Sequence, residues 1–281
     1  MTARFSAFNA ADLATLSSTV APYAGRPIDN LKNPRRARTF RFPAAGGQSI
    51  KGTWGGQGWL CGCAALKGFN FEPAATIRFR GFPNADWTGT PVMDTTAVAA
   101  YNAAALGNGF WWGVSPLGSS IFNGFIGEKF WVRWFTPGLI LSFQFDISDP
   151  TNSWQYNDIS RLWVGDADTM LVNAEFGLKA GLVERTEQEE SDGGSLMSDG
   201  RLPRRRISGR FPYLVESERQ AWAEALGLVG KRKQFCITFA EGEVAALERD
   251  YTLIGAKFTD LPDLSADYPE GTTLPFSIVE A

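Results

Sequence analysis

Alternation of apolar and polar side chains is the strongest constraint in this chain, and it is clearest at 139–147. Leu139, Leu141, Phe143, Phe145 and Ile147 fall on one side of an extended chain, and the residues between them fall on the other. A period of two is the pattern of a β-strand with one buried face. A polar, turn-rich segment follows at 148–152, and a second strand-like run at 159–164 ends at Gly165. The stretch therefore predicts two strands joined by a polar loop.

Further strand-like runs occur throughout the first half of the chain. They lie at 40–42, 50–54, 59–64, 75–82 and 128–135. Together with 139–147 they predict at least six strands in about 110 residues, which is the spacing of a β-sandwich or jelly roll. Thirty glycines and fifteen prolines supply turns between short strands, and 21 Phe and ten Trp are typical of strand-rich proteins. We therefore expect a mostly β fold.

A chain of 281 residues exceeds the usual size of one domain, so two domains are expected. Residues 1–36, small and polar with three prolines, are predicted to form an N-terminal arm. Residues 37–148 are the predicted jelly-roll β-sandwich, and 149–281 a second β-sandwich with one helix at 217–228. Ser217 is the expected N-cap of that helix, and Gln220 would complete a capping box.

The chain contains no histidine. Catalysis by Ser–His–Asp or Cys–His groups is therefore excluded, and so is a histidine zinc ligand. Paired carboxylates can still hydrolyse glycosides, but no pair stands out in the sequence. We expect no enzyme, no catalytic residue, no cofactor and no metal site.

Three cysteines, Cys61, Cys63 and Cys236, are too few for a disulfide scaffold or a four-thiolate metal site. We expect them to be small buried side chains in a reduced cytosol. The N-terminus lacks the apolar core of a signal peptide, and the charge-free stretch 95–127 is too often interrupted for a membrane helix. Synthesis in a cytoplasm and the absence of a membrane segment are the corresponding expectations.

Charge is unevenly distributed along the chain. Residues 1–148 hold 13 Lys and Arg against 7 Asp and Glu, a balance of +6, whereas 149–281 hold 14 against 23, a balance of −9. Opposite charges on two halves suit head-to-tail contact between copies, and chance in surface composition explains the split equally well. A brief basic cluster at 35–38 in an acidic chain does not predict nucleic-acid binding.

Three groups of side chains are candidates for contact with ligands or partners. Phe110, Trp111 and Trp112 form an aromatic group that would stack on a sugar ring if exposed, or be buried in a core strand or between subunits. Arg204, Arg205 and Arg206 are expected on a solvated edge or in an inter-subunit ion pair. Asp146, Asp149 and Asp158 have oxygen ligands for calcium, but ordinary turn chemistry is favoured.

The stretch around the 148–152 turn resembles a pattern in structural proteins of tailed bacteriophages and prophages. There an aromatic-rich strand runs into D-I-S-D-P-x-N, and a strand reading I-x-R-L-x-x-G follows. The positions that carry the pattern here are Asp146, Asp149, Pro150, Asn152, Arg161 and Gly165. Weaker cues are the segments 59–63 and 75–82, Gly193-Gly194, Arg204–Arg206 and 216–226. The chain departs from the pattern in its aromatic loop at 99–127 and in lacking a glycine after Asn152.

The resemblance implies an N-terminal jelly roll similar to discoidin or galactose-binding modules. It also implies a structural component of a bacteriophage tail tip or baseplate, forming a homo-oligomeric ring that links the tail tube to hub or fibre proteins. Location in the virion tail would follow. The alternative is a carbohydrate-binding module that recognises a host glycan, because exposed Trp111 and Trp112 would suit a sugar.

Overall fold

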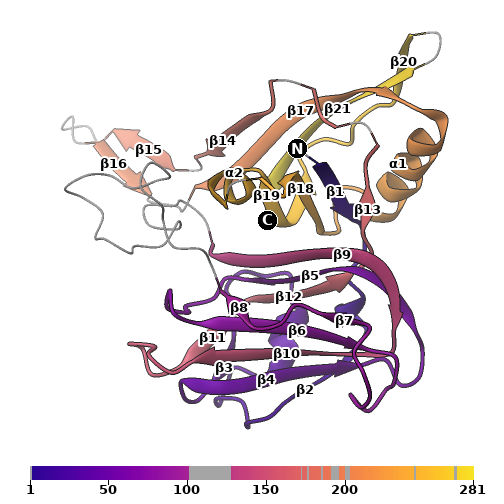
Figure 1. Cartoon of the computed structure of the whole chain (residues 1–281). Helices are drawn as coiled ribbons and strands as arrows, with labels where there is room; N and C mark the ends of the chain where they lie inside the picture. Colours follow the sequence, from indigo (N-terminus) through magenta and orange to yellow (C-terminus); the bar gives the residue numbers. More distant parts are fainter. Residues whose placement is uncertain are drawn as a thin grey trace.

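The computed structural model describes residues 2–100, 128–171, 173–175, 177–184, 186–190, 196–199, 203–243, 245–268 and 271–281. In this part of the chain the fold is mostly β, as predicted, with antiparallel sheets and one long helix (Figure 1). None of the described helices is long and apolar enough to cross a membrane.

The outer sheet has six strands in the order β2-β4-β10-β6-β7, with β8 also paired to β6. Its strands are β2 (Thr15–Ser18), β4 (Gly46–Thr53), β6 (Thr76–Phe82), β7 (Met93–Asp94), β8 (Val98–Ala99) and β10 (Ser142–Asp149). Phe143, Phe145 and Ile147 of β10 are buried, while Asp146 and Ser148 are not. The predicted alternation therefore holds over 145–148. At the start of the run it is wrong, because Leu139 is 59% exposed while Ile140, Ser142 and Gln144 are buried. The reason is that the chain passes from β9 to β10 between Ile140 and Ser142, so 139–147 is not one strand.

The middle sheet consists of β5 (Trp59–Lys67) between β12 (Arg161–Gly165) and β9 (Phe130–Ile140). All five residues of β12 and the last seven of β5 are buried, so both faces of these strands are covered. On one side the Trp131 ring lies 6.1 Å from the ring of Phe145 in the outer sheet. On the other, the guanidinium of Arg205 lies 5.3 Å from the ring centroid of the neighbouring residue, Phe130.

The large sheet has eight strands in the order β13-β1-β18-β19-β21-β17-β14, with β20 also paired to β21. They are β1 (Thr2–Ser6), β13 (Asp168–Thr169), β14 (Lys179–Val183), β17 (Arg204–Leu214), β18 (Phe235–Glu241), β19 (Thr252–Phe258), β20 (Ser265–Tyr268) and β21 (Gly271–Glu280). Small elements complete the described fold: β3 (Phe40–Phe42) with β11 (Asn157–Ile159), β15 (Glu187–Glu190) with β16 (Leu196–Asp199), η1 (Ala10–Asp12), η2 (Ile28–Lys32) and α2 (Ala245–Asp250).

Helix α1 (Glu216–Val229) packs on the large sheet through Trp222, which is buried. The Trp222 ring lies 5.0 Å from Phe5 of β1 and 5.3 Å from Phe211 of β17. Since β1 and β17 are separated by three strands in the sheet order, the sheet curves around this side chain. The predicted helix at 217–228 thus corresponds to α1. Its capping box is wrong, because the N-cap is Val215, whose carbonyl accepts from the amide of Arg219, and no side chain caps the helix.

Strand pairing crosses the predicted domain limits. Within the predicted arm 1–36, β1 pairs with β18 of the large sheet and β2 with β4 of the outer sheet. Beyond the predicted boundary at 148/149, β11 pairs with β3 and β12 with β5. β12 is the edge strand of the middle sheet beside β5, and β1 lies between β13 and β18 in the large sheet. Both strands therefore pair with partners that are distant in the sequence.

The three cysteines are free and buried, as expected for small apolar side chains. Burial raises the pKa of the Cys61 thiol to about 12, and burial together with a hydrogen bond to Cys236 raises the pKa of Cys63. Cys63 and Cys236 come from the middle and the large sheet, so this contact lies where the two sheets meet.

Candidate functional site

The aromatic group Phe110, Trp111 and Trp112 lies outside the described residues. Its proposed contact with a sugar or a subunit therefore stays a prediction.

The pattern residues Asp149 and Asn152 are buried in a polar network under the 150–156 loop. The Asn152 side-chain amide donates to Asp149 Oδ2 at 2.9 Å and to Asn157 Oδ1 at 2.8 Å, and Asp149 also accepts from the amide of Glu72. Burial raises the pKa of Asp149 against these lowering hydrogen bonds. Pro150 opens the loop and is exposed. The network fixes the loop, as turn chemistry predicts.

Two other pattern residues join β12 to the N-terminal segment. The guanidinium of Arg161 donates to both carboxylate oxygens of Asp12 at 2.7 Å and to the carbonyl of Leu31 at 3.2 Å. At Gly165 a side chain would meet the carbonyl oxygen of Phe8. These residues therefore have intramolecular roles in the fold.

The arginine group 204–206 is partly buried within the chain. Arg205 is buried and pairs with the buried carboxylate of Glu280 at 3.0 Å, and it donates to the carbonyls of Arg249 and Thr252. Arg206 donates to the hydroxyl of Ser277 on β21. An inter-subunit contact of Arg204 or Arg206 stays a prediction, whereas the Arg205 guanidinium is held inside its own chain.

The three aspartates weighed as calcium ligands do not converge. Asp146 pairs with Arg80, Asp149 belongs to the loop network, and Asp158 pairs with Arg26 and Arg41. Across the described ranges, no three or more His, Cys, Asp or Glu side chains form a group able to hold a metal ion.

An aromatic and charged surface lies at the end of the outer sheet where β10 leads into β11. It comprises Tyr23, Arg26, Arg41, Trp154, Tyr156 and Asp158, and we call it the end cluster. The guanidinium of Arg41 stacks 3.7 Å from the Tyr156 ring centroid and lies 5.6 Å from that of Tyr23. The Trp154 ring lies 6.3 Å from Tyr156. Trp154 is 63% exposed and Tyr23 is 51% exposed, so both present large ring surfaces to solvent.

A charged group sits at the centre of the end cluster. Asp158 accepts two hydrogen bonds of 2.7 Å from Nε and Nη2 of Arg41 and one of 3.1 Å from Arg26. Arg26 also donates to the hydroxyl of Thr39 at 2.6 Å. The hydrogen bond to Asp158 raises the pKa of Arg41. Two guanidinium groups and one carboxylate leave this centre with one positive charge.

The buried loop network presents Trp154 at the surface. The side-chain oxygen of Asn152 accepts from the amide of Trp154 at 2.9 Å, and the next residue, Gln155, has a φ of 59°. The carbonyl of Gln155 accepts in turn from the amide of Ala45. A left-handed conformation in a residue other than glycine is uncommon and costs free energy, so the fold holds this loop in one geometry. The pattern residue Asn152 is therefore the support of an exposed aromatic side chain.

Sequence reasoning missed the end cluster, apart from Asp158. Tyr23 and Tyr156 are far apart in the chain and meet only through Arg41 of β3, which pairs with Asp158 of β11. One signal was present in the sequence, namely Trp154 in a polar turn. A tryptophan with polar sequence neighbours on both sides is expected to be exposed.

Comparison with known proteins gives similarity of structure and none of sequence. No protein-family model matches the chain, and no curated protein matches it. The family 32 carbohydrate-binding module of C. perfringens NanJ, solved with galactose, is 12% identical over 59% of this chain and 99% of that chain, with a TM-score of 0.36. A fucose-binding module of Streptococcus pneumoniae is 7% identical over 56% and 94%, also with a TM-score of 0.36.

A third similar structure is the lectin-binding domain of lectinolysin in complex with Lewis b. It is 9% identical over 57% of this chain and 96% of that chain, with a TM-score of 0.38. These three structures are carbohydrate-binding modules or domains. At TM-scores this low the similarity carries no argument about function, so any proposal must depend on the side chains of the chain itself.

Proposed function

We propose that the protein binds carbohydrate at the end cluster. The observation that carries the proposal is the pair of exposed rings, Trp154 beside Tyr156 and Tyr23 beside Arg41, in one cluster with the fixed Arg41–Asp158 group. Flat aromatic faces pack against the C–H surface of a sugar ring, and guanidinium and carboxylate groups bind its hydroxyls. This is the alternative function that the sequence suggested, placed on different residues.

The end cluster is organised before a ligand arrives. Arg41 is held by stacking on Tyr156 and by two hydrogen bonds to Asp158, so its guanidinium loses little freedom on binding. The lone pairs that Asp158 does not use toward arginine can accept from sugar hydroxyls. A rigid aromatic and polar surface of this kind suits a neutral sugar of one or a few rings.

The test is a titration of the purified protein with saccharides, by calorimetry after a glycan-array screen. Galactose and fucose, the sugars named for two of the similar structures, are the first probes. Trp154→Ala is expected to weaken binding about tenfold or more, because one stacking ring is lost. Leu171→Ala is the control, since this leucine is exposed but lies beyond β13, outside the cluster.

Two outcomes would count against carbohydrate binding. One is an array without signal for the wild-type protein, and the other is equal affinity of Trp154→Ala and wild type for the sugar that binds. Trp154→Phe distinguishes a loss of stacking from a loss of folding as the cause of weaker binding. It keeps an aromatic face, so it should retain part of the affinity.

We propose, as a second candidate, the structural role in a phage tail that the sequence resemblance implies. It would place the protein in a virion, as a homo-oligomeric ring that contacts tail-tube, hub or fibre proteins. What supports it in this chain is an exposed aliphatic group on and beside the paired strands β5 and β9. Leu60 and Leu139 are cross-strand partners, 57% and 59% exposed, and Val92 next to Gly138 is 53% exposed. Contiguous exposed aliphatic side chains are typical of contact surfaces between proteins.

Light scattering on the purified protein tests the second candidate. A ring would give a multiple of the 30.7 kDa monomer mass, and the double variant Leu60→Ser and Leu139→Ser should shift it to the monomer. A wild-type protein that is monomeric at all concentrations, with and without tail-tube protein, would remove this candidate.

A further inference from the structure

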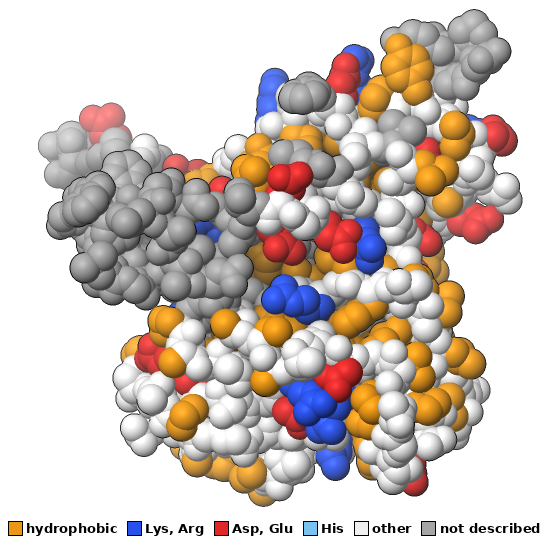
Figure 2. Space-filling view, in the orientation of Figure 1, with side chains coloured by type: hydrophobic (Ala, Val, Ile, Leu, Met, Phe, Trp, Pro, Cys, Tyr) orange, Lys and Arg blue, Asp and Glu red, His pale blue; other side chains and the backbone are white. Residues whose placement is uncertain are grey.

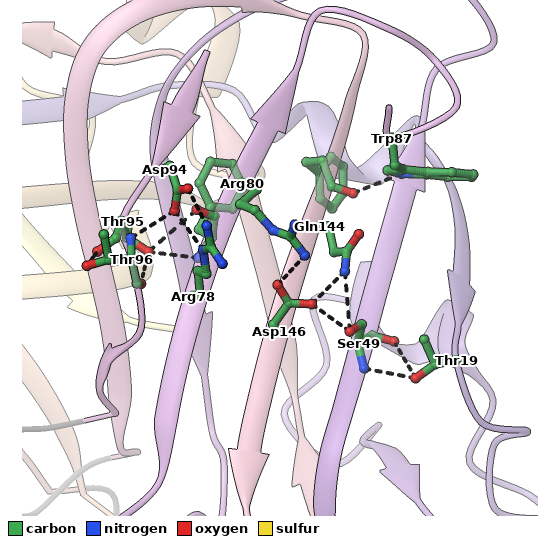
Figure 3. Close-up of polar contacts among 12 residues, drawn as sticks. Thr19, Ser49, Arg78, Arg80, Trp87, Asp94, Thr95, Thr96, Gln144 and Asp146 are labelled. Atoms are coloured by element: carbon green, nitrogen blue, oxygen red, sulfur yellow. Dashed lines mark hydrogen bonds and ion pairs between the residues drawn. The ribbon is translucent and has the colours of Figure 1, made fainter. Parts of the chain in front are cut away.

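The outward face of the outer sheet carries a row of polar side chains in register. Gln144 of β10 is opposite Lys51 of β4 on one side and Arg80 of β6 on the other. The next row places Asp146 between Ser49 and Arg78. Figure 3 shows the side chains of Ser49, Arg78, Arg80, Gln144 and Asp146 on neighbouring strands, and Figure 2 shows a compact group of basic and acidic side chains on the lower part of the molecule.

Both carboxylates of this face are engaged by donors of the chain itself. Asp146 accepts from Arg80 at 2.6 Å, from the Ser49 hydroxyl at 2.6 Å and from the Gln144 amide at 2.5 Å. Asp94 accepts two hydrogen bonds from Arg78, at 2.8 and 2.5 Å (Figure 3). These bonds lower the pKa of Asp94, the hydrogen bond to Arg78 having the largest effect.

Lys51 is the cation of this face that lacks a carboxylate. Its ammonium lies 5.3 Å from the centroid of the Trp87 ring and makes no ion pair within the part of the chain that the structure describes. With Arg78 paired to Asp94 and Arg80 paired to Asp146, three cations face two carboxylates, which leaves one positive charge on the face. An anionic group is the chemical complement of that charge.

Trp87 lies beside Lys51, and its side chain is held in place by hydrogen bonds. Its indole nitrogen donates to the carbonyls of Gly52 and Phe143 at 3.2 and 3.1 Å, across the β4–β10 pair. Its backbone has a φ of 59°, a conformation that residues other than glycine rarely adopt. The ring is only half-buried, so part of it is open to a ligand. Such strained, over-determined positions are concentrated at binding sites.

We infer that this outward face binds an acidic saccharide. Its carboxylate or sulfate group would pair with Lys51, its ring would lie beside Trp87, and its hydroxyls would bind the guanidinium of Arg80, whose side chain is 25% exposed. Gln144 is buried and holds Asp146 in place beneath this surface. The inference goes beyond the end cluster and uses none of its residues. The Asp149–Gly46 pair near the end cluster lies five positions along the strands from the Gln144–Lys51 pair, which places the two sites about 17 Å apart.

The experiment is a calorimetric titration at low ionic strength with three oligosaccharides of equal length: a hexuronate, a sulfated galactan and a neutral galactan. Lys51→Gln should lower the affinity for the acidic ligand about tenfold, and Lys51→Arg should restore most of it. The control is Lys179→Gln, which removes the same charge from an exposed lysine of β14 that has no ion pair among the described residues. The thermal midpoint of every variant is measured to confirm folding.

The hexuronate and the sulfated galactan identify the anionic group, and binding of either supports the inference. No binding of either by the wild-type protein would overturn it, as would equal losses in Lys51→Gln and Lys179→Gln. Binding of a nucleic-acid or acidic-peptide probe with the same dependence on Lys51, and of no saccharide, would also overturn it. Binding of neutral sugar at the end cluster is scored separately with Trp154→Ala, so failure of one site does not decide the other.

Discussion

Gly165 has no room for a side chain, because a Cβ there would lie 2.0 Å from the carbonyl oxygen of Phe8. The bridge between Asn9 and Gly165 holds the two backbones together, so the clash cannot be relieved by a rotamer change. We expect Gly165→Ala to lower the free energy of unfolding by about 3 kcal/mol, measured by urea denaturation. Gly181→Ala is the control, since a Cβ at Gly181 on exposed β14 meets nothing within 4 Å. Equal stability of the two variants would contradict this packing.

At the same residue scale, the sequence predicted the chemistry of the motif but not what it supports. Asp149 and Asn152 form a turn network, as their residue types indicate. The exposure of Trp154 above that network depends on Tyr156 and Arg41, and on the β3–β11 pairing that brings them together. Contacts of such long sequence separation leave no periodic signal, so the end cluster could not be read from one sequence.

At the scale of elements, helix α1 contains one glycine that weakens it and is followed by one that it needs. Gly227 is exposed within the helix, and a Cβ there meets nothing within 4 Å. Gly230, the C-cap, has φ 54° and ψ −154°, which other residues avoid. Gly227→Ala should therefore raise the free energy of unfolding by about 0.5–1 kcal/mol, whereas Gly230→Ala should lower it by about 1–3 kcal/mol. Thermal denaturation of both variants measures the signs, and the same sign for both would contradict the helix end described here.

The elements that the sequence located best are those with one buried face. Alternation predicted β10 and β6, whose polar side chains form the outward face of the outer sheet. The continuous apolar run of β5 gives no such alternation, because the outer and large sheets cover both of its faces. The sequence therefore could indicate strands in the middle sheet but not that this sheet is shared between two cores.

At the scale of the whole molecule, a buried group of charges joins the middle and large sheets. Glu280 at the end of β21 pairs with Lys67 of β5 at 3.1 Å and with Arg205 of β17 at 3.0 Å. All three residues are buried. Removing one member of a buried ionic group leaves the remaining charges without compensation, which costs more than the group contributes when it is complete. The stability of the assembled sheets should therefore depend on the charge of Glu280.

This dependence predicts how stability changes with pH. Burial raises the pKa of Glu280, but Lys67 and Arg205 outweigh that effect and lower it from 4.5 to about 2. Because the folded-state pKa lies below the unfolded one, the stabilisation is complete above about pH 4.5 and is lost as the pH falls toward 2. Glu280→Gln should lower the free energy of unfolding by about 3 kcal/mol at pH 7, and the difference from wild type should shrink between pH 4.5 and 2.

Urea denaturation of wild type and Glu280→Gln at a series of pH values measures this difference. Glu216→Gln is the matched control, because Glu216 pairs with Arg219 on the exposed surface of α1, where solvent screens the interaction. The control should change stability little at any pH. A Glu280→Gln variant as stable as wild type at pH 7, or a difference that does not depend on pH below 4.5, would show that the ionic group does not hold the two sheets together.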